Sequence, residues 1–150
     1  MSESSGPTGT ALDAFPAPPC AQLLGFKFLS LDRDAKTIRA GFEATEAMLN
    51  PRGMTQGGFL TAMLDDAMGF MIVALTNGEK APASVDLHTQ FLRPAPAGAY
   101  VGEARLKHMT NSTAFTEATL YDAQGEAVAA AVQTQRLFPI PKAGAGSTRS

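Results

Sequence analysis

The stretch "NPRGMTQGGFLTAMLDDAMGFMIV", residues 50–73, decides the fold. Its second half has the apolar spacing of a helix, and one stripe of the wheel carries Leu60, Met63, Leu64, Ala67, Met71 and Ala74. The opposite side is also small or apolar, with Ala62, Gly69, Ile72 and Val73. We therefore predict a loop over residues 48–56 and a helix over residues 57–75, about 28 Å long, that other elements surround.

Two adjacent carboxylates, Asp65 and Asp66, interrupt this apolar helix. Burying an unpaired carboxylate costs several kcal/mol, so the pair requires an explanation. The two side chains project about 100° apart on the wheel and cannot both face the same way. Periodicity alone does not choose between them, and each is compatible with a purely structural role.

The rest of the chain reads as short strands. A helix is expected in "PPCAQLLGF", with Gly25 as its stop, and strands over residues 26–31 and 37–43 flank the turn "DRDAK". Beyond residue 83 the β-branched and aromatic segments are "SVDLHTQFLRP", "AGAYVGEARLKHMT", "TAFTEATLYD" and "AVAAAVQTQRLF". We expect them to form a long antiparallel meander. The prediction is an α+β fold in which about six antiparallel strands curve around one long central helix.

Composition limits the function classes. The chain has 150 residues, 45% of them hydrophobic and 17% charged, and a formal net charge of −2. It has no basic run, so we expect neither nucleic acid nor a membrane as partner. The single cysteine, Cys20, excludes an internal disulfide. With no signal-peptide pattern and no run of about 18 apolar residues, a cytoplasmic location is expected. We predict disordered tails at residues 1–10 and 141–150 around a single domain, residues 11–140.

The segments "NPRGMTQGGFLTAMLDDAMG", "SVDLHTQFLRPAPAG" and "DAQGEAVAAAVQTQRLF" together resemble the hotdog-fold acyl-CoA thioesterases of the PaaI-like, phenylacetate-pathway type. That family carries Asn-x-x-Gly-x-x-His-Gly-Gly, followed by an acidic residue nine positions after the His. The resemblance spans roughly residues 26–138. It implies hydrolysis of an acyl-CoA thioester, here a small, medium-chain or aryl one, at sites between the subunits of a homodimer or a dimer of dimers.

Asp65 matches the family's catalytic acid, which implies a role as general base or as nucleophile. Gly57 matches the glycine whose N–H, at the positive end of the helix, polarises the thioester carbonyl. Without a side chain, Gly57 would let the carbonyl approach this N–H closely, and Gly58 beside it is a candidate for substrate binding. The alternative is a glycine pair that serves only the tight entry into the helix. Asp66 has no such match, and we expect it to pair with an Arg or Lys or to border a subunit interface.

The loop before the helix supplies two further candidates. Asn50 matches a residue that contacts the water or the thioester from the subunit opposite Asp65, but asparagine before proline is also common in turns. Gln56 stands where the family has His. Its amide can donate a hydrogen bond but cannot carry a proton, so any mechanism that needs an imidazole here is in doubt.

Two candidates lie on or beside the strand that begins at residue 84. Ser84 matches a hydroxyl that orients the attacking water, and strict alternation predicts that it shares a face with Asp86, His88 and Gln90. Arg93 is a candidate ligand of a coenzyme A phosphate, or else an ordinary surface arginine.

Neither histidine is spaced for nucleophilic catalysis or metal binding, so we predict no metal and no cofactor. Two other functions remain open for this resemblance. One is a hotdog protein that binds acyl-CoA without catalysis, in which Gln56 in place of His would mark the lost activity. The other, ranked lower, is a hotdog enoyl-CoA hydratase or dehydratase, which typically pairs a His with an acid.

Overall fold

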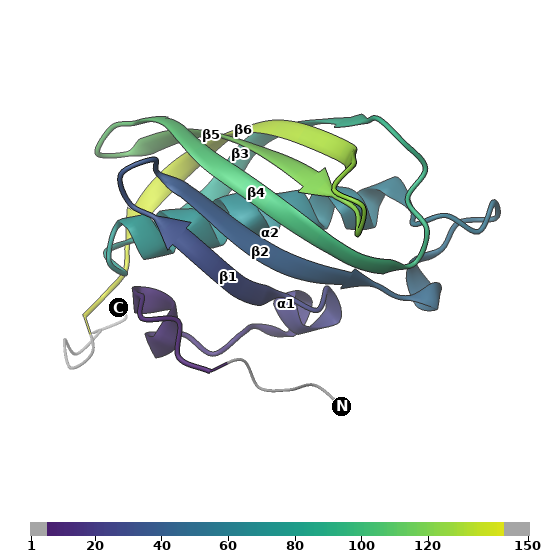
Figure 1. Ribbon diagram of the computed structural model, residues 1–150. Helices are drawn as coiled ribbons and strands as arrows, with labels where there is room; N and C mark the ends of the chain where they lie inside the picture. The colour runs from purple at the N-terminus through teal and green to yellow at the C-terminus, as the bar shows by residue number, and fades with distance from the viewer. Residues whose placement is uncertain (1–5, 143–150) are drawn as a thin grey trace, which may run out of the picture.

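The computed structural model describes residues 6–142, in which one sheet curves around one long helix (Figure 1). The elements are η1 Ala11–Ala14, α1 Pro19–Leu23, β1 Lys27–Asp32, β2 Thr37–Ala44, η2 Glu46–Met48, α2 Gly57–Leu75, β3 Lys80–Phe91, β4 Gly98–Met109, β5 Thr113–Tyr121 and β6 Ala127–Pro139. All strand pairs in the sheet are antiparallel. The predicted α+β hotdog arrangement is confirmed.

Helix α2 forms the centre of the core. Every residue of its predicted apolar stripe is buried, and so are Met68 and Ile72. The helix is long and apolar enough to cross a membrane by length and mean hydropathy, contrary to our expectation that no segment qualifies. Its apolar side chains are instead packed against the inner face of the sheet, which explains why both sides of the wheel lack a polar stripe.

The strands follow the order β1-β2-β4-β5-β6-β3, so the expected simple meander is wrong in one respect. Strand β3 pairs with β6 at the edge of the sheet, and the segment between β3 and β4 carries the chain across to a place between β2 and β5. Local alternation records which face of a strand is buried, but it does not name the neighbouring strand. At this edge, β3 lies beside the part of α2 that carries Asp65.

A β-bulge in β3 decides which of its side chains face the helix. Ser84 pairs with Gln135 and Asp86 with Thr134, so Val85 is an extra residue on this strand. The bulge puts Ser84 on the helix side and Asp86 and His88 on the outer side. The prediction that Ser84 shares one face with Asp86, His88 and Gln90 is therefore wrong, because one inserted residue reverses the alternation.

The segment before the sheet packs beside α2. Helix α1 ends before Gly25, as expected, and Gly25 has a φ of 66°. A Cβ there would lie 2.8 Å from the Cβ of Glu43, so only glycine fits this turn. Within the predicted N-terminal tail, the N–H groups of Thr8 and Gly9 donate to the Asp13 carboxylate. Most of the two predicted tails, residues 1–5 and 143–150, lies outside the described residues.

Candidate functional site

Three polar side chains from three elements meet beside the middle of α2. Ser84 Oγ, from β3, donates a 2.8 Å hydrogen bond to Asp65 Oδ1. Gln133 Nε2, from β6, donates to the same Asp65 Oδ1 and, at 2.7 Å, to Ser84 Oγ. Asp65 itself is half-buried, and Ser84 is exposed at the sheet edge. Within residues 6–142, no hydrogen bond reaches Asp65 Oδ2, which leaves this oxygen available for chemistry.

Gln133 is the member of this cluster that sequence reasoning missed. It is 3% exposed, and it lies on the inner face of β6. The signal was present in the alternation of "AVAAAVQTQRLF". Gln133 and Gln135 fall on the same side of the strand as the buried Ala131 and Leu137, so two glutamines occupy apolar positions.

Asp66 occupies a different environment from Asp65. Its Oδ2 is buried and has no hydrogen-bond partner among the described residues. Burial, and to a lesser extent the charge of Asp65, raises the pKa of Asp66 to about 6. Of its two expected surroundings, pairing with an Arg or Lys of the same chain is wrong, because the ion pairs in the described part of the chain are Arg93–Glu126 and Arg105–Glu117. A place at a subunit interface stays a prediction.

The N-terminus of α2 forms a second group of candidates. Gln56 is the N-cap residue, and its side chain makes no capping hydrogen bond. Its Oε1 lies only 2.7 Å from the position of a Cβ at Gly58. At Gly57 a Cβ would lie 2.9 Å from the ring of Phe91, so this glycine also allows Phe91 to pack against the helix entry. Both glycines therefore have a packing reason in addition to the proposed role of the N–H.

A cavity of about 540 Å³ opens at this helix entry, with Asn50, Arg52, Gly57, Leu60, Phe91 and Arg93 among its lining residues. This volume is within the usual range of small-molecule sites. Asn50 Oδ1 accepts the backbone N–H groups of Arg52 at 2.9 Å and Met54 at 3.2 Å, which is the turn role considered above. Its Nδ2 remains a donor. Arg93 lies at the rim, in a 3.2 Å ion pair with Glu126.

The structure does not bring the two groups of candidates together within one chain. Gly57 and Asp65 stand eight residues apart on a straight helix, which separates them by about 12 Å along its axis. One thioester carbonyl cannot contact both at bonding distance. Asp65, Ser84 and Gln133 form one cluster, whereas Asn50, Gly57 and Arg93 form the other.

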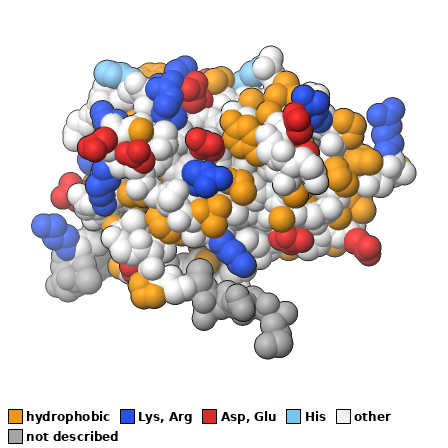
Figure 2. Space-filling view, viewed as in Figure 1, with side chains coloured by type: hydrophobic (Ala, Val, Ile, Leu, Met, Phe, Trp, Pro, Cys, Tyr) orange, Lys and Arg blue, Asp and Glu red, His pale blue; other side chains and the backbone are white. Residues whose placement is uncertain are grey.

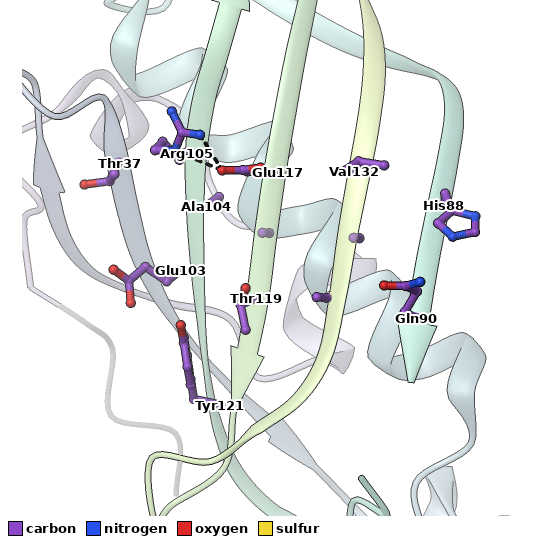
Figure 3. A pocket seen from close by; sticks show the side chains of 13 residues that line it. Thr37, His88, Gln90, Glu103, Ala104, Arg105, Glu117, Thr119, Tyr121 and Val132 are labelled. Carbon is purple, nitrogen blue, oxygen red and sulfur yellow. Dashed lines mark hydrogen bonds and ion pairs between the residues drawn. The ribbon is translucent and has the colours of Figure 1, made fainter. Parts of the chain in front are cut away.

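The outer face of the sheet carries another hollow, of about 390 Å³, away from both groups (Figure 3). The Arg105–Glu117 ion pair crosses it, and His88 lies at its margin on β3. Its position on the outer face separates it from α2, so we assign it no part in the candidate chemistry. Figure 2 shows acidic and basic side chains interspersed on the visible face of the molecule. Among the described residues, no three His, Cys, Asp or Glu side chains are grouped to hold a metal ion.

Comparison with known proteins agrees with this fold. A family model described as the thioesterase superfamily matches residues 53–129, about half of the chain. A phenylacetic acid degradation-related protein from Ralstonia eutropha JMP134 is 33% identical, with a TM-score of 0.79 over 84% of this chain and 95% of that one. No curated protein sequence matches significantly.

Two other solved structures share the fold at lower identity. The PaaI protein of E. coli, from its phenylacetic acid degradation operon, is 22% identical, with a TM-score of 0.76 over 86% of this chain and 91% of that one. A thioesterase from Haemophilus influenzae is 14% identical, with a TM-score of 0.76 over 89% of this chain and 92% of that one. At such identities the likeness establishes the fold alone.

Proposed function

This chain belongs to the thioesterase superfamily, and we propose that it hydrolyses acyl-coenzyme A thioesters with a small, medium-chain or aryl acyl group. The observation that carries the proposal is the state of Asp65. One oxygen of this half-buried carboxylate is held by Ser84 and Gln133, and the other is free. A fixed carboxylate with one free oxygen suits either a general base or a nucleophile.

Both routes start at Asp65 Oδ2. In the base route it takes a proton from water while the water oxygen bonds to the thioester carbonyl carbon. The C–S bond then breaks, coenzyme A leaves as the thiolate, and the free acid remains. In the nucleophile route Oδ2 itself bonds to the carbonyl carbon, the thiolate leaves, and water hydrolyses the mixed anhydride. The Gly57 N–H, at the positive end of the helix dipole, stabilises the negative carbonyl oxygen in either route.

The proposal includes a second copy of the chain. Because Gly57 and Asp65 of one chain are about 12 Å apart, the complete site needs the helix entry of another copy opposite Asp65. Strand β3 supports this arrangement, since it is the edge strand beside Asp65 and exposes Val85 and Phe91, and the exposed Leu92 follows it directly. A long edge strand with exposed apolar side chains is a template for pairing with another chain. We therefore propose a homodimer, or a dimer of dimers, with each site shared between subunits.

The cavity at the helix entry supplies the substrate contacts in this proposal. Leu60 and Phe91 provide apolar walls. Arg52 and Arg93 at the same cavity suit the phosphates of coenzyme A, because a guanidinium can make bidentate contacts to phosphate. The Asn50 Nδ2 and the exposed amide of Gln56 are available to donate to the carbonyl.

The residues around Asp65 favour hydrolysis over hydration. A hydratase of this fold typically pairs a His with an acid. In the described residues both His88 and His108 are exposed, and neither forms a hydrogen bond with Asp65. The side chains at the helix entry and beside Asp65 include the glutamines Gln56 and Gln133, which cannot carry a proton as His does. The alternative is a protein that binds thioesters without hydrolysing them, and the experiment must distinguish it from a thioesterase.

The test is release of free thiol from a panel of short, medium-chain and aryl acyl-coenzyme A substrates. Turnover on at least one of them, absent from a blank without protein, supports the proposal. Thermal stabilisation by the same compounds without thiol release would replace the proposed hydrolase with a binding protein. Neither turnover nor stabilisation would reject both.

A further inference from the structure

A buried glutamine lies directly behind the candidate catalytic carboxylate. We propose that Gln133 is a positioning residue: its Nε2 ties Ser84 Oγ to Asp65 Oδ1, so that Asp65 Oδ2 is the oxygen that reacts. This inference rests on the proposed function, because it assigns the chemistry of the same site to one atom. Gln133 is a residue that neither the sequence analysis nor the family resemblance had singled out.

The hydrogen atoms account for the arrangement. An amide nitrogen carries two hydrogens, and those of Gln133 are directed to Asp65 Oδ1 and to Ser84 Oγ. Since Ser84 Oγ accepts from Gln133, its own hydrogen is free to go to Asp65 Oδ1, at 2.8 Å. The reverse orientation of the amide would press Gln133 Oε1 against a carboxylate oxygen, so the donor assignment follows from chemistry.

The amide oxygen of Gln133 makes no contact that would explain why a glutamine stands at this position. Gln133 Oε1 is buried, and the described residues offer it no hydrogen-bond donor. A buried acceptor without a partner lowers stability, and an apolar residue there would avoid that loss. Neighbours on the same face, Ala131 and Leu137, are apolar and buried. The benefit of an amide at this position must therefore come from its contacts with Asp65 and Ser84.

Because both donors bond to Oδ1, the two oxygens of Asp65 have different roles. Oδ1 holds the side chain in one orientation, and Oδ2 keeps its lone pairs for the water proton or for the carbonyl carbon. Without Gln133, Ser84 can turn its hydroxyl away and the carboxylate can rotate about its last bond. Substrate binding, which uses the cavity at the helix entry, should be little affected. The expected loss is in kcat rather than in KM.

The experiment compares Gln133→Met with Gln135→Met. Methionine has a similar length but no donor. Gln135 is 1% exposed on the same strand face and bonds Thr116 instead of Asp65, which makes it a matched control. We expect Gln133→Met to lower kcat by about tenfold or more with KM within about threefold. Gln135→Met should change neither kcat nor KM.

A second readout does not depend on turnover. With ¹³Cγ-labelled aspartate, the Asp65 carboxyl signal, assigned by its absence in Asp65→Asn, reports on the hydrogen bonds and the orientation of the carboxylate. A changed chemical shift or a broadened signal in Gln133→Met, and not in Gln135→Met, supports the positioning role even if the wild-type protein releases no thiol. An unchanged signal, or an equal change in both variants, overturns it. If Gln133→Met does not fold, the shorter amide of Gln133→Asn takes its place with the same expected results.

Discussion

Ser84 lies 19 positions after Asp65 in the chain, on strand β3, and its Oγ donates to Asp65 Oδ1 at 2.8 Å. The contact depends on the bulge at Val85, which turns Ser84 toward α2. Asp65 and Asp66 are neighbours in sequence, yet only Asp65 has such partners. This difference in surroundings, rather than the helix itself, separates the two carboxylates.

Asp65→Asn should abolish most of the thioesterase activity. The amide keeps the size of the side chain but cannot act as base or nucleophile, so we expect kcat/KM to fall by at least about a hundredfold, or about 2.7 kcal/mol. Thiol release gives the rates. Asp66→Asn is the matched control and should retain activity within a few-fold. Equal losses in the two variants would contradict the assignment of Asp65.

Ser84→Ala should lower kcat by about tenfold, corresponding to about 1.4 kcal/mol, because Asp65 Oδ1 loses one of its two donors. Thr89→Val is a suitable control. The Thr89 hydroxyl also lies on β3 and forms a 3.2 Å hydrogen bond to Thr61 of α2, but it does not touch Asp65. A kinetic comparison in which both variants lose activity equally would assign the effect to strand–helix packing.

Gly57→Ala should lower activity more than stability. The added methyl meets the ring of Phe91, which is 54% exposed and can move, so we expect the melting temperature to change little. The same methyl stands at the mouth of the cavity where the thioester carbonyl must approach the N–H, and kcat/KM should fall by about tenfold or more. Gly41→Ala, where a Cβ makes ordinary contacts of 3.7 Å, is the control. Full activity of Gly57→Ala would disprove close approach at this position.

Stability should depend on pH through Asp66. Its pKa is about 6 in the folded chain against an ordinary value of 3.8, so the folded state binds more protons than the unfolded state between these values. Stability from this group is therefore lost as pH rises from about 4 to above 6. Asp66→Asn should be more stable than wild type at pH 7, by about 1 to 2 kcal/mol after solvent screening, and equal to it near pH 3. Urea unfolding at both pH values measures the difference; a constant gap would point to another cause.

A shared site predicts complementation between inactive variants. Asp65→Asn and Gly57→Ala each damage one half of the site, but a mixed dimer carries one site with both halves intact. After unfolding and refolding an equal mixture, half of the dimers are mixed, and about a quarter of the wild-type activity should return. Each variant refolded alone is the control. No recovery, with mixed dimers verified by mass spectrometry of differently tagged chains, would place the complete site within one chain.

The sequence by itself determined the local elements and named Asp65 and Ser84 as candidates. The spacing of Leu60, Met63, Leu64 and Ala67 predicted the central helix, and its bounds agree with the structure. The strand predicted over residues 37–43 is confirmed as β2, in which Ile38, Ala40 and Phe42 form the buried face. Such patterns are local, because burial of one face repeats with the period of the helix or strand.

Only the tertiary structure decided what lies beside Asp65. Strand pairing is a long-range property, so alternation did not show that β3 is an edge strand next to β6. One extra residue, Val85, reversed the faces of β3 and brought Ser84 to the helix. Gln133 lies 68 positions from Asp65 in the chain, and no local period connects them. The sequence determined the buried positions of the central helix, and the packing of distant strands decided which oxygen of Asp65 is held and which is free.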